Sequence, residues 1–349
     1  MGDLIMTTPA MRALKETFPQ ARLSLLTSPA GAIISGLIPE VDETIVYKAP
    51  WMKLNELLES RDDRRMIEYL RGFHFDAAVI FTVYSQSPLP AALLCYLAEI
   101  PLRLAHCREN PYELLSHWIP EKEPSLERHE VRRQLDLVAA IGAETEQEQL
   151  GLSVPDAAYR SISRRLKRLN VDDGRLLAVV HPGASAPSRR YPAESYGRAL
   201  SILLNRWSLD VIFTGLPSEV ELIRSIQKII PFPTHSLAGE LDCEELAALI
   251  DSANVLISNN TGPAHIAAAT NTPLVDLYAL TNPQHTPWQV PHRVLFYDVP
   301  CKYCYKSICP EKHHDCLRRV TPEEVAFAAE ELLSGRMIQE GEENVYAGH

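Results

Sequence analysis

The sequence predicts an α/β protein made of two doubly wound domains that face each other across a cleft. Its 349 residues exceed the size at which a single hydrophobic core usually stops growing. Short apolar runs alternate with segments of helical periodicity, which is typical of βα units around a parallel sheet. This rhythm stops at a polar stretch and then restarts. Ligands of such sheets bind at the carboxyl ends of the strands, so we expect the functional residues in the loops there.

The first domain is expected over residues 1–155. Its first helix follows Asp3, with Thr8 as the N-cap, Pro9 at the first helical position and Phe18-Pro19 at its end. Apolar runs with strand character follow, interrupted by helical patterns. They are residues 22–27, 42–47 and 76–81.

The second domain is expected over residues 170–335. Residues 143–175 are polar and irregular, so the boundary is placed near 150–175. Further apolar runs follow this boundary, again separated by helical patterns. They are residues 176–181, 210–215, 254–259, 273–278 and 293–298. Residues 336–349 are expected to form a frayed tail.

Composition and charge exclude several classes of protein. The formal net charge of −11 disfavours a broad nucleic-acid surface, because duplex binding depends on Lys and Arg that neutralise phosphates. No apolar run approaches the roughly 20 residues that cross a bilayer, and the N-terminus lacks the pattern of a signal peptide. We therefore expect a cytoplasmic protein. The odd total of seven cysteines argues against a disulfide scaffold.

Two loops of the second domain have the composition of phosphate sites. In HPGASAPSRRYP, after the run at 176–181, small residues allow close backbone approach, and Arg189 and Arg190 can grip a phosphate. In SNNTGPAH, a strand ends just before Thr261-Gly262, where backbone N–H groups at a helix start attract anions. A diphosphate would fit between these loops. The alternatives are a solvated loop and an ordinary capped helix, with His265 as a structural histidine.

A cluster of cysteines lies near the end of the second domain. Cys301, Cys304, Cys309 and Cys316 follow the spacing C-x2-C-x4-C-x6-C, with His313 and His314 inside it. Four sulfurs so spaced could hold a structural zinc ion, although the spacing is not that of a standard finger. Reduced thiols that pack a loop, or a local disulfide, are the alternatives.

Several segments, in order and spacing, closely resemble the ADP-heptose:lipopolysaccharide heptosyltransferases, glycosyltransferase family nine. They are GDLIMTTPAMRALKETFPQARLSLLTSPAG, HPGASAPSRRYP, FTGLPSEVELI, LAGELDCEELAALIDSANVLISNNTGPAHIAAATNTPLVDLY and TNPQHTPW. The resemblance covers nearly the whole chain. It implies the GT-B fold of two Rossmann-like domains. It also implies an inverting transfer of heptose from ADP-heptose to a lipopolysaccharide inner-core acceptor, without a cofactor for catalysis and at the inner membrane's cytoplasmic face.

The resemblance also implies roles for particular residues. Asp3 would be the general base that activates the acceptor hydroxyl. Arg189 stands where the family commonly has a phosphate-binding lysine, and Thr261 with Gly262 would donate to the β-phosphate. Glu219 resembles the ribose-binding acid and Leu241 the apolar position against adenine. The implied donor site comprises Ser185, Arg189, Glu219, Leu241, Asn260, Thr261 and Gly262.

The chain departs from the family pattern at two places. Asn260 stands where many relatives have aspartate before Thr-Gly, and its amide could donate to a phosphate. Relatives also carry an apolar strand immediately before the motif that here begins at Met1, so we expect that this start is internal or truncated. These departures keep two alternatives open: another nucleotide-sugar donor, or a nucleotide-sugar-binding protein without turnover. Fold analogy alone would also admit a nucleotide-sugar epimerase.

The acceptor side is predicted from basic residues and position. Arg128, Arg132 and Arg133 lie near a helix start and could meet an anionic core sugar or phosphate, although such a run is often a solvated helix face. Residues 84–87 follow the run at 76–81 and are a candidate acceptor wall. Trp51 could belong to a membrane-facing rim or pack half-buried.

Overall fold

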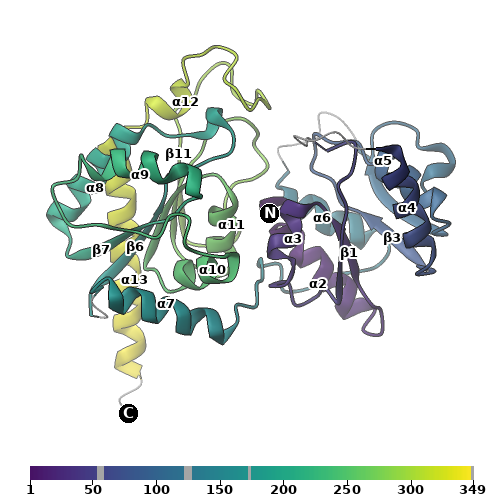
Figure 1. Cartoon of the computed structure of the whole chain (residues 1–349), viewed down its shortest axis with the longest axis horizontal. Helices are drawn as coiled ribbons and strands as arrows, with labels where there is room; N and C mark the ends of the chain where they lie inside the picture. Colours follow the sequence, from purple (N-terminus) through teal and green to yellow (C-terminus); the bar gives the residue numbers. More distant parts are fainter. Residues whose placement is uncertain (53–58, 122–127, 172–173, 347–349) are drawn as a thin grey trace. The chain divides into compact units, whose positions relative to one another are not determined.

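The computed structural model describes residues 1–52, 59–121, 128–171 and 174–346 (Figure 1). Contacts divide the chain into two compact units. The first comprises Met1 and residues 3–148, and the second comprises Gly2 and residues 149–349. Each unit is described by itself below.

The first unit carries two parallel sheets. Strands β1 (Ser24–Thr27) and β2 (Glu43–Val46) pair with each other. The other sheet has the order β3 (Ala77–Ile80), β4 (Leu102–Cys107) and β5 (His117–Pro120). The helices are α1 (Gly2–Ile5), α2 (Thr8–Thr17), α3 (Pro29–Ser35), α4 (Ser60–Arg71), α5 (Leu89–Leu97), the 3-10 turn η1 (Tyr112–Leu114) and α6 (Glu130–Ala139).

The core of this unit forms where α4 and α5 pack on the strands. Ala92 and Cys95 of α5 lie with Leu70 of α4 and with Ile80 and Ala105 of the sheet in one buried cluster. Fully burying a side chain of Leu or Ile size contributes roughly 1.5–3 kcal/mol. This packing fixes the carboxyl ends of β3 and β4, from which the loops of the candidate acceptor side extend.

The predictions for this half need two corrections. Helix α2 begins at Thr8, with Thr7 as N-cap, and the Thr8 hydroxyl donates to the Ile5 carbonyl instead of capping the helix. Strands β4 and β5 were not predicted, because Arg103 and His106 interrupt the apolar pattern of one and Pro120 ends the other. The three predicted strands are present as β1, β2 and β3.

The second unit is built on one parallel sheet of six strands, in the order β11-β10-β9-β6-β7-β8. The strands are β6 (Leu176–His181), β7 (Leu209–Phe213), β8 (His235–Ser236), β9 (Val255–Asn259), β10 (Leu274–Leu277) and β11 (His292–Leu295). The helices are α7 (Asp156–Arg168), α8 (Ala193–Arg206), α9 (Val220–Gln227), α10 (Cys243–Asp251), α11 (Gly262–Ala269), α12 (Asp315–Arg318) and α13 (Pro322–Tyr346), with 3-10 turns η2 (Pro187–Arg189) and η3 (Pro217–Glu219).

Helices cover both faces of this sheet (Figure 1). Alternate strand residues such as Val180 and Ile257 join α8, α9 and α13 in one buried cluster. Strand β9 is buried at every position, which explains why its first three residues, Val255–Ile257, are all apolar and do not alternate with polar ones. All five predicted strands are present, and only the two-residue β8 was missed.

The segment expected to be irregular contains α7. This helix is strongly charged, and its register is set by polar contacts with α10: the Ser161 hydroxyl donates to Glu245 over 2.6 Å, and Tyr159 donates to Asp251. Likewise, α13 continues to Tyr346, so the predicted tail from residue 336 is helical up to that point, and residues 347–349 lie outside the described residues.

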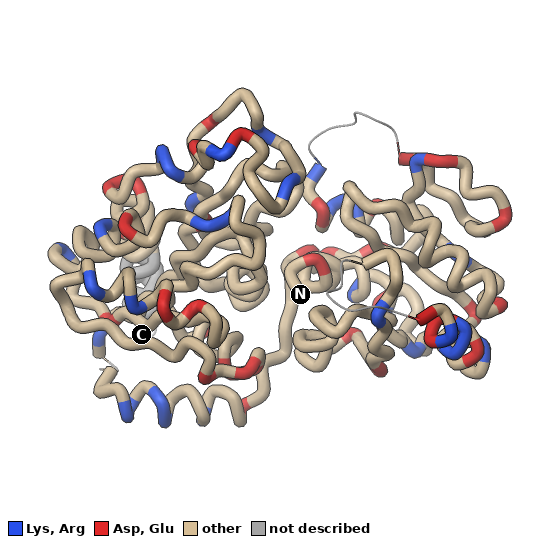
Figure 2. Tube along the Cα trace, turned by 45° about the horizontal axis from the view of Figure 1, so that its top comes forward, with Lys and Arg blue, Asp and Glu red and all other residues tan. Residues whose placement is uncertain are grey.

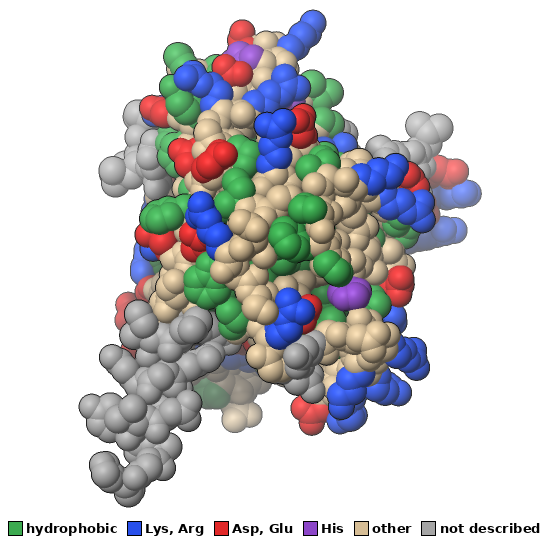
Figure 3. Space-filling view, turned by 90° about the vertical axis from the view of Figure 1, so that its left-hand side faces the viewer, with side chains coloured by type: hydrophobic (Ala, Val, Ile, Leu, Met, Phe, Trp, Pro, Cys, Tyr) green, Lys and Arg blue, Asp and Glu red, His purple; other side chains and the backbone are tan. Residues whose placement is uncertain are grey.

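The surface mixes charges of both signs. Figure 2 shows acidic and basic residues interspersed along both units, and on the face in Figure 3 hydrophobic side chains lie in small groups among charged ones. In the described part of the chain, no helix has both the length and the apolar character needed to cross a bilayer. Trp51 packs edge-on against Tyr47, with ring centroids 5.7 Å apart.

Candidate active site

The strand order of the second unit reverses between β6 and β9, which are adjacent in the sheet although β7 and β8 lie between them in chain order. At such a switch point the loops after the two strands diverge, and ligands bind between them. The Asn259 side chain, at the end of β9, joins these loops. Its amide donates to the Pro182 carbonyl over 2.8 Å, and its amide oxygen accepts from the Tyr191 backbone N–H over 3.0 Å.

Of the two arginine side chains in the loop after β6, that of Arg190 is hydrogen-bonded within the loop and that of Arg189 is not. The Arg190 guanidinium donates to the Ala184 carbonyl over 2.7 Å. Ser188 is buried, and its hydroxyl donates to the Lys306 carbonyl over 2.8 Å, which fixes the turn η2. Arg189 is half-buried at the end of η2, and within the described ranges its side chain makes no hydrogen bond or ion pair. The guanidinium of Arg189 is therefore available to a ligand.

The loop after β9 leads directly into the start of α11. Thr261 is the N-cap, with extended backbone, but its hydroxyl donates to the Asn259 carbonyl over 3.2 Å and does not cap the helix. Pro263 has no N–H group and the Ala264 N–H donates to the Thr261 carbonyl over 3.0 Å, so the Gly262 N–H is the uncapped group at the start of α11 that can attract an anion. Gly262 at the first helical position permits close approach of a ligand.

Three further donor candidates lie at the same edge of the sheet. Glu219 follows β7, and its carboxylate crowds Gly183 so closely that a Cβ atom there would meet Oε1 at 2.0 Å. Leu241 follows β8, where the Gly239 backbone N–H donates to the Gly215 carbonyl over 2.8 Å. Ser185 is exposed on the loop after β6. The predicted donor residues thus all follow carboxyl ends of strands in one sheet.

Asn260 differs from its prediction because its amide hydrogens point into the protein. Its Nδ2 atom donates to Asp276 Oδ2 and to the His285 carbonyl, each over 2.9 Å. Both amide hydrogens are used, so Asn260 cannot donate to a phosphate as expected. Asp276 lies on β10 and was not predicted, although a carboxylate inside the apolar run PLVDLY is a sequence signal, because buried charges are rare without a partner.

Asp276 makes the stability of the protein depend on pH. Burial raises the pKa of its carboxyl group from 3.8 to about 7, although the Asn260 hydrogen bond and the Arg189 charge oppose the shift. The folded state therefore binds this proton more tightly than the unfolded state, and the stability it contributes at low pH is lost as the pH rises from about 4 to about 7.

We expect the Asp276→Asn variant to lose this pH dependence. Between about pH 5.5 and about pH 8, the free energy of unfolding of the native protein should fall by about 2 kcal/mol more than that of the variant. Urea unfolding at both pH values measures the difference. Parallel changes in the two proteins would show that Asp276 is already ionised at the lower pH.

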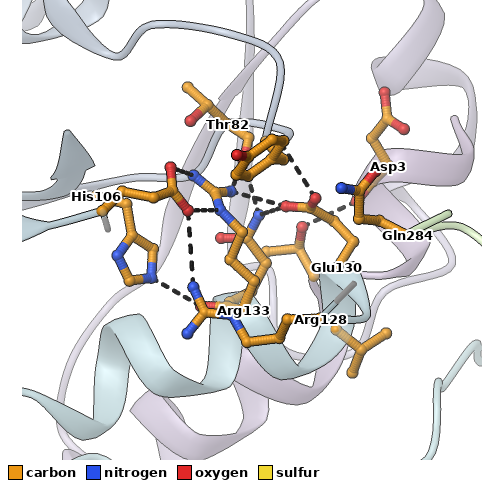
Figure 4. A network of polar contacts seen from close by, with 12 residues as sticks. Asp3, Thr82, His106, Arg128, Glu130, Arg133 and Gln284 are labelled. Carbon is orange, nitrogen blue, oxygen red and sulfur yellow. Dashed lines mark hydrogen bonds and ion pairs between the residues drawn. The ribbon is translucent and has the colours of Figure 1, made fainter. Parts of the chain in front are cut away.

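In the first unit, Asp3 lies on the short helix α1 with an exposed side chain. Its backbone carbonyl accepts from the buried Thr7 hydroxyl over 2.9 Å, which anchors the turn. No described residue forms a hydrogen bond or ion pair with its carboxylate. Asp3 lies beside Glu130, with its carboxylate directed away from the polar network there (Figure 4). A carboxylate so placed is open to an acceptor hydroxyl.

The polar network beside Asp3 centres on Arg133, which is 2% exposed. Its guanidinium donates to Glu121 over 2.6 Å, to Glu130 over 2.8 Å and to the Thr82 carbonyl (Figure 4). The two carboxylates respond differently. Burial raises the pKa of Glu130, whereas for Glu121 burial is outweighed by the Arg133 hydrogen bond together with the positive charges of Arg133, His106 and Arg108, which lower the pKa. Arg133 is thus the shared counterion of two buried acids.

The prediction of three acceptor-binding arginines is therefore corrected at Arg133, which is enclosed and saturated with partners. Arg128 donates to Asp136 over 2.7 Å, and Arg132 pairs with Glu148. Both side chains are partly exposed. Either one would have to leave its carboxylate partner in order to bind a ligand. The sequence showed a run of basic residues, but it did not show that Glu121, Asp136 and Glu148 form ion pairs with these arginines.

The candidate acceptor wall at residues 84–87 is held by the same network. The Tyr84 backbone N–H donates to Glu130 Oε2 over 3.2 Å, and the Arg108 guanidinium lies 4.1 Å from the centre of the Tyr84 ring. Ser85, Gln86 and Ser87 are exposed. The loop is thus anchored at Tyr84, and the polar side chains of the next three residues face solvent.

The four clustered cysteines are free thiols around one small cavity of about 20 Å³. Cys301 Sγ lies 3.6 Å from His313 Nε2, and burial raises the pKa values of Cys301 and Cys316, which favours the thiol form. Among the described residues, no three His, Cys, Asp or Glu side chains are placed to hold a metal ion. The structure therefore does not support the predicted zinc ligand set of Cys301, Cys304, Cys309 and Cys316.

Comparison with known proteins gives one consistent family. Lipopolysaccharide heptosyltransferase 3 of Escherichia coli is 26% identical over 296 residues, which cover 82% of this chain and 83% of that protein. Lipopolysaccharide heptosyltransferase 2 of Salmonella typhimurium is 25% identical, with 96% of each chain covered. The solved structure of E. coli ADP-heptose LPS heptosyltransferase II has a TM-score of 0.74, at 23% identity over 96% of each chain.

These likenesses confirm the predicted fold class, an α/β protein of two Rossmann-like domains with parallel sheets. The family model for glycosyltransferase family 9 (heptosyltransferase) matches residues 64–314, which include most of both units and both loops at the switch point. The chain is therefore a glycosyl-transferring enzyme and belongs to glycosyltransferase family 9, the heptosyltransferases.

Proposed function

We propose that the protein transfers heptose from ADP-heptose to an inner-core sugar of lipopolysaccharide, with inversion at the anomeric carbon. The observation that carries the proposal is the anion site at the switch point, where the Arg189 side chain makes no hydrogen bond or ion pair within the described residues and α11 begins without a side-chain cap from Thr261. The relatives are named as lipopolysaccharide heptosyltransferases, and the solved E. coli protein is named for ADP-heptose.

In the proposed reaction, Asp3 takes the proton of the acceptor hydroxyl as its oxygen attacks the anomeric carbon. The bond between that carbon and the β-phosphate oxygen breaks, and its electron pair leaves with ADP. Arg189 and the Gly262 N–H at the start of α11 stabilise the charge that grows on the diphosphate. Glu219 would bind the ribose, Leu241 would pack against the adenine, and Ser185 would add a donor to the phosphates. No metal or cofactor takes part in this scheme.

The acceptor would bind along residues 84–87 of the first unit, with Arg128 and Arg132 near its anionic groups. Because that acceptor is lipid-linked, we propose that the enzyme works in the cytoplasm at the surface of the inner membrane. Titration with ADP, UDP and GDP tests the nucleotide. Selective binding of ADP is expected, whereas preference for UDP or GDP would assign another sugar donor. Binding without turnover of any acceptor would leave a binding protein.

Replacement of Arg189 by alanine should weaken ADP binding by about 10–100-fold, because a charged hydrogen-bond donor to the diphosphate is lost. Calorimetric titration with ADP measures the effect. Arg198→Ala is the matched control, since Arg198 lies on α8 with a side chain 64% exposed and paired with Glu194. Equal ADP affinity in the native protein and the Arg189 variant would contradict the phosphate role.

A further inference from the structure

The hydrogen bonds of Asn260 fix which end of its amide a ligand can meet. Its two partners, the Asp276 carboxylate and the His285 carbonyl, each lie 2.9 Å from Nδ2. The His285 carbonyl is an acceptor only, and an ionised carboxylate accepts only as well. Turning the amide over would bring its oxygen against both oxygens, so the observed orientation is the stable one. The amide oxygen is the polar atom that Asn260 has left to offer.

Asp276 has its backbone fixed in the sheet and a carboxylate for which Asn260 is the hydrogen-bond partner. It lies on β10 in register with Ser258 of β9, and its side chain is fully buried. The His285 backbone also belongs to this arrangement, because its N–H donates to the Tyr278 hydroxyl, which in turn donates to the Asn282 carbonyl over 2.8 Å. Asn260 therefore receives one partner from the neighbouring strand and one from the loop beyond it.

We propose that Asp276 is a positioning residue that turns the Asn260 amide oxygen toward the donor, where it accepts a hydrogen bond from a hydroxyl of the transferred sugar. Asn260 directly precedes the Thr261-Gly262 start of α11, so its backbone lies beside the proposed diphosphate site, and the residue is 6% exposed. A sugar attached to the diphosphate carries hydroxyl donors, whereas phosphate oxygens are acceptors and gain nothing from an amide oxygen. The pair Asn260–Asp276 thus selects for the sugar and not for the nucleotide. This inference rests on the proposed function.

The experiment compares the dissociation constants of ADP and ADP-heptose by calorimetry in Asn260→Ala, Asp276→Leu, the double variant and Asp276→Asn. Asn260→Ala and Asp276→Leu should each lose about tenfold in the preference for ADP-heptose over ADP, and the double variant should lose no more than either. Asp276→Asn keeps an acceptor for the Asn260 amide and should stay within about twofold of the native preference. ADP affinity is the reference within each variant, because the charge of Asp276 also acts on Arg189, and a cooperative urea unfolding transition shows that each variant folds.

Two results would overturn the inference. Equal losses for ADP and ADP-heptose in Asp276→Leu would show a merely structural role for Asp276. A further loss of preference in the double variant would show that Asp276 does not act through Asn260. A native protein that binds ADP-heptose no better than ADP would contradict the proposed donor instead, and the orientation of Asn260 is then tested without ligand.

The ligand-free test is the side-chain amide signal of Asn260 in nuclear magnetic resonance. Arg189, Tyr196 and Tyr278 are the titratable groups that interact electrostatically with Asp276, and burial raises the pKa values of both tyrosines above their usual range. Asp276 is therefore the group of this set that titrates near neutral pH. The Asn260 signal should shift between about pH 6 and about pH 8 in the native protein and stay constant in Asp276→Asn. An Asn260 signal that is insensitive to pH in the native protein and unchanged by Asp276→Leu would refute the contact, whatever the donor.

Discussion

Asp3→Asn is expected to lower the rate of glycosyl transfer by about 10²–10⁴-fold, the usual contribution of a general base. Asparagine has nearly the same shape but cannot take a proton at the pH of the reaction. The side chain of Asp3 is exposed, so the substitution should leave the fold of α1 unchanged. ADP affinity should also be unchanged, because the nucleotide would bind at the sheet edge of the second unit. Release of ADP at saturating donor and acceptor measures the rate.

The matched control for Asp3 is Asp62→Asn. Asp62 lies on α4, its side chain is 58% exposed, and it forms a surface ion pair with Arg65. It has no proposed role in binding or catalysis. Its replacement should leave turnover within about twofold, since surface pairs contribute about 0–1 kcal/mol. A rate for Asp3→Asn equal to that of the control would show that another group takes the proton.

Arg133→Met should lower the free energy of unfolding by about 3–5 kcal/mol, because Glu130 loses its counterion and Glu121 keeps only its longer ion pairs, with Arg128 over 3.6 Å and with Arg108 over 4.0 Å. Glu121 and Glu130 have side chains only 4% and 1% exposed, so water cannot replace the guanidinium. Methionine fills much of the volume, which separates the loss of charge from the formation of a cavity. Urea unfolding, followed separately by fluorescence and circular dichroism, measures the change.

The control for Arg133 is Arg224→Met, which removes an exposed pair with Glu221 on α9 and should change stability by less than about 0.5 kcal/mol. If Arg133→Met were no more destabilising than this control, the network of Figure 4 would contribute little to the fold. The loop at residues 84–87 would then need another anchor.

The strands of the second unit were predictable because the sheet is covered on both faces. Burial on both sides requires continuous apolar runs, as in LLAVVH at β6, and such runs are visible in sequence. Strands β4 and β5 escaped prediction because they carry Arg103, His106 and Trp118, whose polar atoms find partners only in the folded protein. Helix α7 escaped because its stabilising contacts are polar and lie on α10.

The candidate site was predictable in position and not in detail. Strand ends and small-residue loops indicated where a diphosphate would bind, since both depend on local sequence. The direction of the Asn260 amide depends on Asp276 and His285, which lie on the next strand and the loop after it. The enclosure of Arg133 likewise depends on Glu121, which reaches it from the end of β5. Such pairings follow from tertiary structure alone.

The Asn259 side chain has a consequence for the thermodynamics of ligand capture. Because it binds the loop after β6 at Pro182 and at Tyr191, that loop is tied to the end of β9 before any nucleotide arrives. The conformational entropy of these backbone segments is therefore lost when the protein folds, and not when the nucleotide binds. Nucleotide capture in the second unit should resemble docking to a rigid surface, with little coupled ordering of the chain.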